Sequence, residues 1–133
     1  RPDARVLVYV HGVDDVDEAL CDPQIASMIY QRFRYAPHDV GYSYDEASLR
    51  AFYIHRSYNF AVDFDEYLQR KERPYTAQNL RDLRELAVRR TPAYILLDCR
   101  GQEVARYAGP WPTEDPDGFA TQFRRFLTLQ GGP

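Results

Sequence analysis

The sequence is poor in cysteine, since its 133 residues contain only Cys21 and Cys99. Two cysteines are too few for a scaffold held together by several disulfides, and their spacing does not match that of a zinc site. The chain also contains no Cys-x-x-Cys motif. This excludes ordinary dithiol exchange, which needs an attacking thiolate and a resolving thiol three residues apart.

Long apolar runs and an excess of positive charge are missing as well. No apolar segment approaches the roughly 18 residues that cross a bilayer, so we expect no membrane insertion. The net charge of −3 and the pI near 5.6 argue against a general nucleic-acid-binding surface, and we expect no nucleic-acid partner. The chain begins with Arg1 and not with Met, which leaves open the possibility that its N-terminus is processed. Cytoplasmic and periplasmic locations are both compatible with the sequence.

What the chain does contain is enough apolar material for a core. Hydrophobic residues make up 44% of the sequence and charged residues 28%, which is the composition of a folded protein. The length fits one domain, so we expect residues 1–133 to form a single domain.

The first elements follow from local patterns. Residues 5–10 form a short valine-rich run, which is typical of a strand covered on both faces. Asp22-Pro23 combines an N-cap with a proline in the first turn, and apolar residues at helical spacing follow. These features predict a helix that begins at Pro23 and reaches about Arg34.

The middle of the chain has weaker signals. Residues 37–44 are predicted to be a loop, and Asp45 is placed to cap a further short helix. Alternation of aromatic and small or polar residues over 57–64 predicts the second strand. The charged residues 65–73 are then expected to form a solvated connection.

The second half has clear boundaries. Thr76 is placed to cap a helix, and Pro92 begins an apolar strand that turns at Arg100-Gly101 and returns as a hairpin. Asp115-Pro116 repeats the cap-plus-proline signal and opens a last helix.

This order of elements predicts an α/β fold. A strand, a helix and a second strand should form a parallel unit through a right-handed crossover. The last two strands form an antiparallel hairpin that is followed by a helix. We therefore expect a central mixed sheet, with parallel βαβ and antiparallel ββα parts, flanked by helices.

The local sequence resembles proteins of the thioredoxin-like superfamily. Thr91-Pro92, the apolar residues 93–97, the turn 98–101 and the strand ending at Gly109 are similar to the second half of bacterial thioredoxin-related proteins. Residues 20–33 resemble the segment after the active-site turn in that group, and also the same segment of UAS domains, adaptor modules that often lack the redox cysteines. The middle matches poorly, so we expect a variable insertion at about 35–56.

The resemblance implies a thioredoxin-like fold with a cis peptide bond before Pro92, lying against the active-site corner. At that corner this chain has His11, Gly12, Val13, Asp14 and Asp15 in place of the redox pair. We expect the acidic residues Asp14, Asp15, Asp17 and Glu18 to occupy the first turns of a helix, where they complement its positive end.

Neither cysteine has the surroundings of a strong nucleophile. Cys21 follows four acidic residues, whose negative charge disfavours a thiolate, and a small half-buried residue is the simpler interpretation. Cys99 lies in the predicted hairpin turn and is expected to be an incidental exposed thiol. A single-thiol role for Cys21 nevertheless stays open as an alternative.

Other kinds of chemistry have little support. Carboxylates near His11 offer ligands for a divalent ion, but their spacing matches no established metal loop, and we expect no metal. No glycine-rich phosphate loop or nucleophile elbow is present, and we expect no cofactor.

Aromatic residues are the remaining feature. Tyrosines of the 37–44 region cannot all be buried in a loop, and exposed tyrosines favour protein contacts. Trp111, between two prolines, is a candidate anchor for a partner or, alternatively, a lid over the last helix.

Two functional hypotheses follow. The first is a redox-inactive thioredoxin-fold module that binds another protein or an extended peptide through His11 to Asp15 and Thr91-Pro92, with Trp111 as a further contact. In the superfamily, the backbone beside the cis-proline can hydrogen-bond an extended peptide. The alternative is a divergent thiol-disulfide oxidoreductase that uses Cys21 alone.

Overall fold

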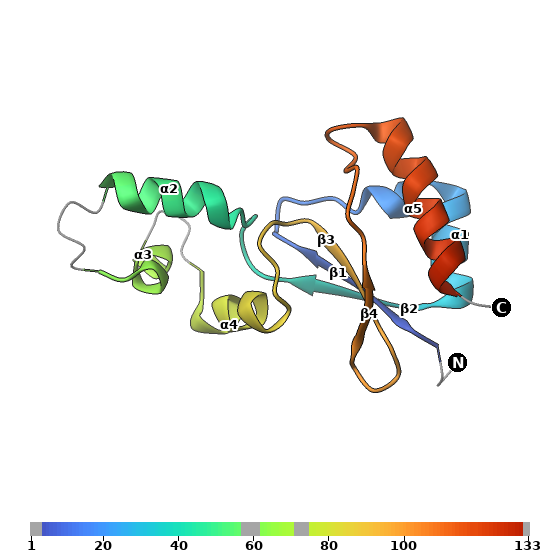
Figure 1. Ribbon diagram of the computed structural model, residues 1–133, viewed down its shortest axis with the longest axis horizontal. Helices are drawn as coiled ribbons and strands as arrows, with labels where there is room; N and C mark the ends of the chain where they lie inside the picture. Colours follow the sequence, from blue (N-terminus) through green and yellow to red (C-terminus); the bar gives the residue numbers. More distant parts are fainter. Residues whose placement is uncertain (1–3, 57–61, 71–74, 132–133) are drawn as a thin grey trace. The chain divides into compact units, whose positions relative to one another are not determined.

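A computed structural model describes residues 4–56, 62–70 and 75–131 (Figure 1). None of the helices in these ranges is long and apolar enough to cross a membrane. The elements in chain order are β1 Val6–His11, the 3-10 helix η1 Glu18–Cys21, α1 Pro23–Arg32, β2 Arg34–Asp39, α2 Glu46–Arg56, α3 Phe64–Arg70, α4 Ala77–Glu85, β3 Ala93–Leu97, β4 Glu103–Arg106 and α5 Pro116–Gly131.

The strands form one mixed sheet in the order β2-β1-β3-β4. The Arg34 N–H donates to Arg5 O, and the Val40 N–H donates to His11 O. The residue numbers of both partners increase together because β1 and β2 are parallel. β3 and β4 are antiparallel, with Ile95 opposite Arg106. The predicted α/β class, with a mixed sheet flanked by helices, is confirmed.

The chain divides into two compact units. The first contains the described residues of 1–9, 16–37 and 93–133, and the second contains 10–15 and those of 38–92. Each unit has its own buried residues.

The first unit is built on one hydrophobic core. Helices α1 and α5 run beside each other in Figure 1, and both contribute side chains to this core. Apolar residues at helical spacing place one stripe of each helix inward. The buried residues of the core are Leu7, Tyr9, Ala19, Ile25, Ile29, Phe33, Tyr94, Leu96, Tyr107, Phe119, Phe123 and Leu127.

The second unit contains α2, α3 and α4. Leu68 of α3 and Leu83 of α4 are fully buried, as is Val40 beyond β2. A capping box begins α4, since the Thr76 side chain accepts the Asn79 N–H and the Asn79 side chain accepts the Thr76 N–H. This confirms the predicted cap at Thr76.

Several other predicted boundaries are confirmed. Asp22 caps α1 by accepting the N–H groups of Gln24 and Ile25, and Pro23 occupies the first turn. Asp115 accepts the Gly118 N–H at the start of α5. The peptide bonds Thr91–Pro92 and Gly109–Pro110 are both cis.

The predicted position of the second strand is wrong. β2 occupies Arg34–Asp39, which overlaps the predicted loop 37–44 and the beginning of the predicted insertion at 35–56. Pro37 favours a loop in this segment, because proline cannot donate a hydrogen bond to a sheet ladder. β2 is an edge strand, where a proline is tolerated.

The region after α2 also differs from the prediction. Residues 57–61 of the predicted strand 57–64 lie outside the described residues, and its last residue, Phe64, begins α3. The solvated connection predicted from residue 65 is helical up to Arg70. Asp63 accepts the Glu66 N–H, and Phe64 and Leu68 are buried one turn apart, so a local cap and a short apolar stripe account for the helix.

Candidate functional site

The predicted corner closes as a turn and not as a helix N-terminus. β1 ends at His11, and the next residues curl back: the Gly12 N–H donates to Asp15 Oδ2 at 2.7 Å, and the Asp15 N–H donates to Gly12 O at 3.1 Å. Asp15 Oδ1 also lies 3.4 Å from Ser43 Oγ. The expectation that Asp14 and Asp15 occupy the first turns of a helix is therefore wrong, because the carboxylate of Asp15 fixes a tight turn instead.

Backbone contacts hold this turn against residues 41–43. The Val13 N–H donates to Gly41 O at 2.6 Å. A Cβ atom on Gly12 would lie 2.3 Å from Ser43 N, so only glycine fits this close approach of two backbones. His11 Nδ1 lies 2.8 Å from Gly12 O, whereas the side chain of Val13 is 60% exposed.

Thr91 and Pro92 are placed in the same unit, and the N–H and hydroxyl groups of Thr91 are engaged within the chain. The Thr91 N–H donates to Tyr44 O at 2.8 Å, and the Tyr44 N–H donates to Thr91 Oγ1 at 2.8 Å. The Glu46 N–H donates to Arg89 O at 2.8 Å. The chain's own residues 44–46 thus occupy the edge at Thr91, and a partner strand pairing there would have to displace them.

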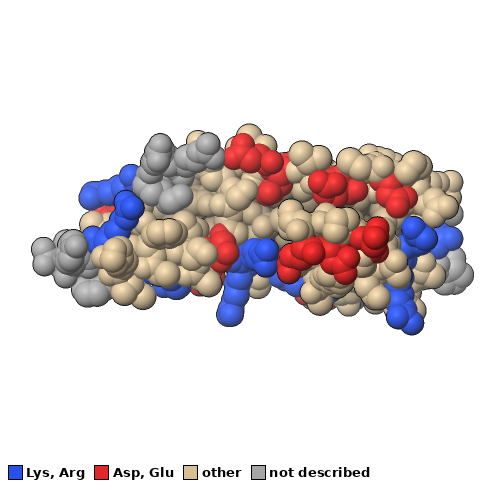
Figure 2. All heavy atoms as spheres, turned by 90° about the horizontal axis from the view of Figure 1, so that it is seen from above, with Lys and Arg blue, Asp and Glu red and all other residues tan. Residues whose placement is uncertain are grey.

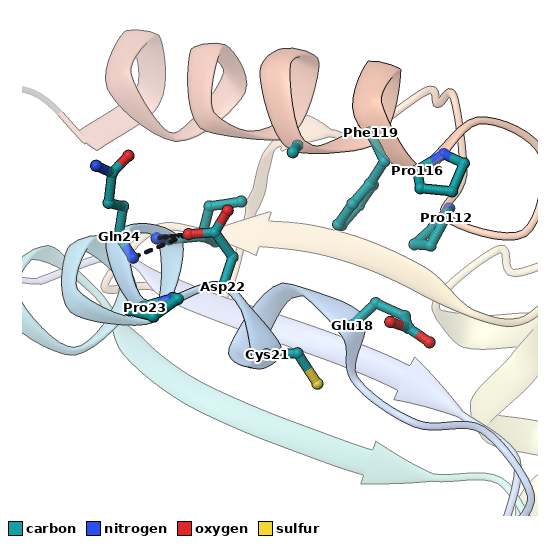
Figure 3. Close-up of a pocket in the computed structure, with 10 residues that line it drawn as sticks. Glu18, Cys21, Asp22, Pro23, Gln24, Pro112, Pro116 and Phe119 are labelled. Atoms are coloured by element: carbon teal, nitrogen blue, oxygen red, sulfur yellow. Dashed lines mark hydrogen bonds between the residues drawn. The ribbon is translucent and has the colours of Figure 1, made fainter.

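The first unit contains an open groove, shown in Figure 3. Its volume is about 640 Å³, and it lies between the η1–α1 segment and the beginning of α5. Pro112, Pro116 and Phe119 project from the α5 side toward the space that faces Glu18 and Asp22 (Figure 3). The lining residues are Glu18, Cys21, Asp22, Pro23, Gln24, Ile25, Pro112, Pro116, Phe119 and Ala120.

Asp17 fixes the η1 wall of this groove to the sheet. Its carboxylate accepts hydrogen bonds from the hydroxyl groups of Tyr35 on β2 and Tyr94 on β3. The same side chain accepts the Ala19 N–H at 3.1 Å and so caps η1. The wall that carries Glu18 and Cys21 is therefore anchored by one charged acceptor with three donors.

The tyrosines around this carboxylate are strongly held in the neutral form. Burial is the first cause that raises the pKa of Tyr94 above its ordinary value, and the negative charge of Asp17 adds to it. Burial, followed by the hydrogen bond to Asp17, likewise raises the pKa of Tyr35. Burial also raises the pKa values of two further tyrosines, Tyr75 and Tyr107, to about 12, without a contribution from Asp17.

Alkaline pH should therefore destabilise the protein before it ionises these phenols in the folded state. The folded pKa values of these tyrosines lie above the unfolded value near 10. Their contribution to the free energy of unfolding is therefore fully present below about pH 10 and decreases as the pH rises above it. For Tyr94, the free energy of unfolding should fall by about 1.4 kcal/mol per pH unit. Urea unfolding at about pH 8, 10 and 11 measures this, and equal values at all three would contradict it.

Trp111 packs onto the core beside the groove. Its ring stacks on Tyr94 at a centroid distance of 6.0 Å and meets Tyr107 edge-on at 5.1 Å. The residue is half-buried, and it does not itself line the groove. This packing agrees more closely with the lid alternative than with a freely projecting anchor.

Both cysteines are exposed thiols in the first unit, so the interpretation of Cys21 as a half-buried residue is wrong. Cys21 Sγ lies 3.8 Å from Asp17 O, and the side chain lines the groove. Cys99 follows β3, in the turn of the hairpin. Across the described ranges, no group of three or more His, Cys, Asp or Glu side chains is arranged to hold a metal ion.

The predicted site residues therefore fall into two places. His11 to Asp15, Thr91 and Pro92 belong to the second unit, whereas Cys21 and Trp111 belong to the first. The groove is not predicted from the sequence, although both cap-plus-proline signals border it: Pro23 and Pro116 are lining residues. Two such helix starts were the available signal, but nothing in the sequence places them opposite each other.

Comparison of the chain with protein-family models, with curated proteins and with solved structures finds no match.

Proposed function

We propose that the chain is a redox-inactive protein- or peptide-binding module with a thioredoxin-like fold. The observation that carries the proposal is the open groove between η1–α1 and α5, which has apolar residues on the α5 side and both polar and apolar residues on the η1–α1 side. The parallel β1-α1-β2 unit and the antiparallel β3-β4 pair followed by α5 support the thioredoxin-like fold. The absence of a Cys-x-x-Cys motif supports the lack of dithiol chemistry.

The groove is a better docking surface than the corner. At the corner, the Thr91 N–H and the Gly12 N–H are already bonded within the chain, so a partner gains no unused donor from them. At the groove, Cys21, Pro23, Gln24 and Pro116 are exposed and Pro112 is half-buried, so the proline rings offer apolar surface to a partner. A partner side chain that enters there removes apolar surface from water, which is the main source of favourable binding energy.

A second function is favoured by one observation. Cys21 is exposed and immediately precedes Asp22, the N-cap of α1, and a thiol at a helix N-terminus can act as a nucleophile. In this alternative, the Cys21 thiolate attacks a partner's disulfide, forms a mixed disulfide and releases one partner thiolate. A thiol supplied by a reduced partner then has to release Cys21.

The two functions are separated by selecting ligands and modifying Cys21. Random peptides of about seven residues displayed on phage are selected against the whole chain, and the affinities of the recovered peptides are measured. We expect Cys21→Ser to bind them within about twofold of the parent, because the proposed contact needs the shape of the wall and not a thiol. Loss of binding in Cys21→Ser, together with an insulin-reducing activity that only the parent shows, would contradict the binding module.

The two cysteines also provide a matched test of location. In Cys99→Ser, a bulky maleimide reacts only with Cys21 and should block peptide binding by filling the groove. In Cys21→Ser, the same reagent reacts only with Cys99, in the hairpin turn, and should leave binding unchanged. If binding survives modification of Cys21 but is lost in Val13→Asp, the peptide binds at the corner and not in the groove.

A further inference from the structure

Acidic residues line the groove on one side and, on the other, adjoin its lining residue Pro116 in the sequence. Glu18 and Asp22 line it from the η1–α1 side, and none of its lining residues within the described part of the chain is Lys or Arg. On the other side, Glu114, Asp115 and Asp117 are exposed at the beginning of α5. Figure 2 shows Asp and Glu side chains gathered on the face that is seen there.

The helix ends do not cancel this charge. The N-termini of α1 and α5 each carry the equivalent of roughly half a positive charge. Asp22 caps the first helix and Asp115 the second, so each positive end already has a full negative charge beside it. Glu18 and Asp117 add further charge, and the balance at the groove is negative.

Cations of the chain do little to compensate. Arg124 Nη2 lies 3.8 Å from Asp22 Oδ2, and both side chains are partly exposed, so this is a long and solvent-screened pair. Within the described ranges, neither Glu18 nor Asp117 forms an ion pair. The two carboxylates therefore face solvent with their charge uncompensated.

Resting on the proposed function, we propose that the ligand of this groove is a basic peptide segment, in which an apolar residue is flanked by Lys or Arg. The apolar residue contacts Pro112, which is half-buried, and Pro116, which is exposed. The flanking cations lie toward Glu18 on one side and Asp117 on the other. Positive charge on both sides of an apolar centre distinguishes this ligand from a simple cation, which would leave the apolar wall exposed to water.

Electrostatic complementarity of this kind acts through several exposed pairs. Each exposed ion pair contributes little, but reversing one carboxylate removes an attraction and adds a repulsion. The effect should weaken with salt, because the charges are accessible to solvent ions. These features define a measurable signature that a purely apolar ligand would not show.

The test uses the peptides recovered from the phage selection and two charge-reversed variants of the whole chain. Glu18→Lys changes the groove, and Glu85→Lys changes the net charge equally on α4, in the second unit. We expect the recovered peptides to carry Lys or Arg around an apolar residue and to bind Glu18→Lys roughly tenfold more weakly than the parent. Glu85→Lys should bind them as the parent does, and high salt should reduce the difference between the variants.

The other outcomes separate the two proposals. Recovered peptides that are neutral or acidic, and that are still blocked by a maleimide on Cys21, would overturn the basic ligand and leave the binding module standing. Spermidine binding to the groove as tightly as the peptides would also overturn it, since that cation has no apolar side chain. If no peptide is recovered, both proposals fail.

Discussion

Replacing Asp17 by alanine is expected to lower the free energy of unfolding by about 3 kcal/mol. The wild-type carboxylate accepts hydrogen bonds from Tyr35, Tyr94 and the Ala19 N–H. The substitution removes a charged acceptor and leaves the hydroxyl of Tyr94, a buried residue, without that partner. The loss of a helix cap on η1 contributes in the same direction.

Urea unfolding measures this difference, with two comparison variants. Asp17→Asn keeps a neutral acceptor, so it should lose less stability than Asp17→Ala. Glu85→Ala removes an exposed carboxylate from α4 and should change the free energy of unfolding by less than about 0.5 kcal/mol. A loss below about 1 kcal/mol in Asp17→Ala would show that the three hydrogen bonds do not anchor the η1 wall.

The second large effect is expected from Gly12→Ala, which should destabilise the protein by about 3 kcal/mol. The new Cβ atom would lie 2.3 Å from Ser43 N and 2.7 Å from Ser43 Cα. Both are backbone atoms that cannot rotate away, so the turn after β1 and residues 42–43 must separate. Their separation would also strain the hydrogen bond from the Val13 N–H to Gly41 O.

Gly101→Ala is the matched control, because it isolates backbone conformation from steric contact. A Cβ atom on Gly101 meets nothing within 4 Å, but its φ of +82° is unfavourable for alanine. This variant should lose only about 1 kcal/mol. If Gly12→Ala loses no more than Gly101→Ala, the close approach at the corner is not a constraint on the fold. Both values come from urea unfolding at neutral pH.

Local signals were the part of the fold that could be predicted from the sequence. Asp22, Thr76 and Asp115 each satisfy N–H groups within three residues of themselves, so their capping roles depend on neighbours along the chain. The β3–β4 hairpin is similarly local. Such features do not depend on where distant segments lie.

Features that depend on tertiary position could not be predicted in the same way. Pro37 argues against a strand unless the strand lies at the edge of a sheet, and that position is known only when the sheet is assembled. In the sequence, Asp17 is one of several acidic residues near a helix start. Its role as an acceptor for Tyr35 and Tyr94 depends on two different strands, which only the folded sheet brings close to it. The groove combines residues near 20 with residues near 116, and it has no signature in either segment alone.

Binding of a peptide in the groove between η1–α1 and α5 is tested by titrating the isotope-labelled protein with a recovered basic peptide and following the amide NMR signals. The signals of Gln24, Ile25 and Ala120 are expected to shift progressively, because these residues line the groove. The signals of Val13 and Asp14 at the corner should stay in place. Shifts at Val13 and Asp14, with the groove signals unchanged, would show that the peptide binds at the corner and not in the groove.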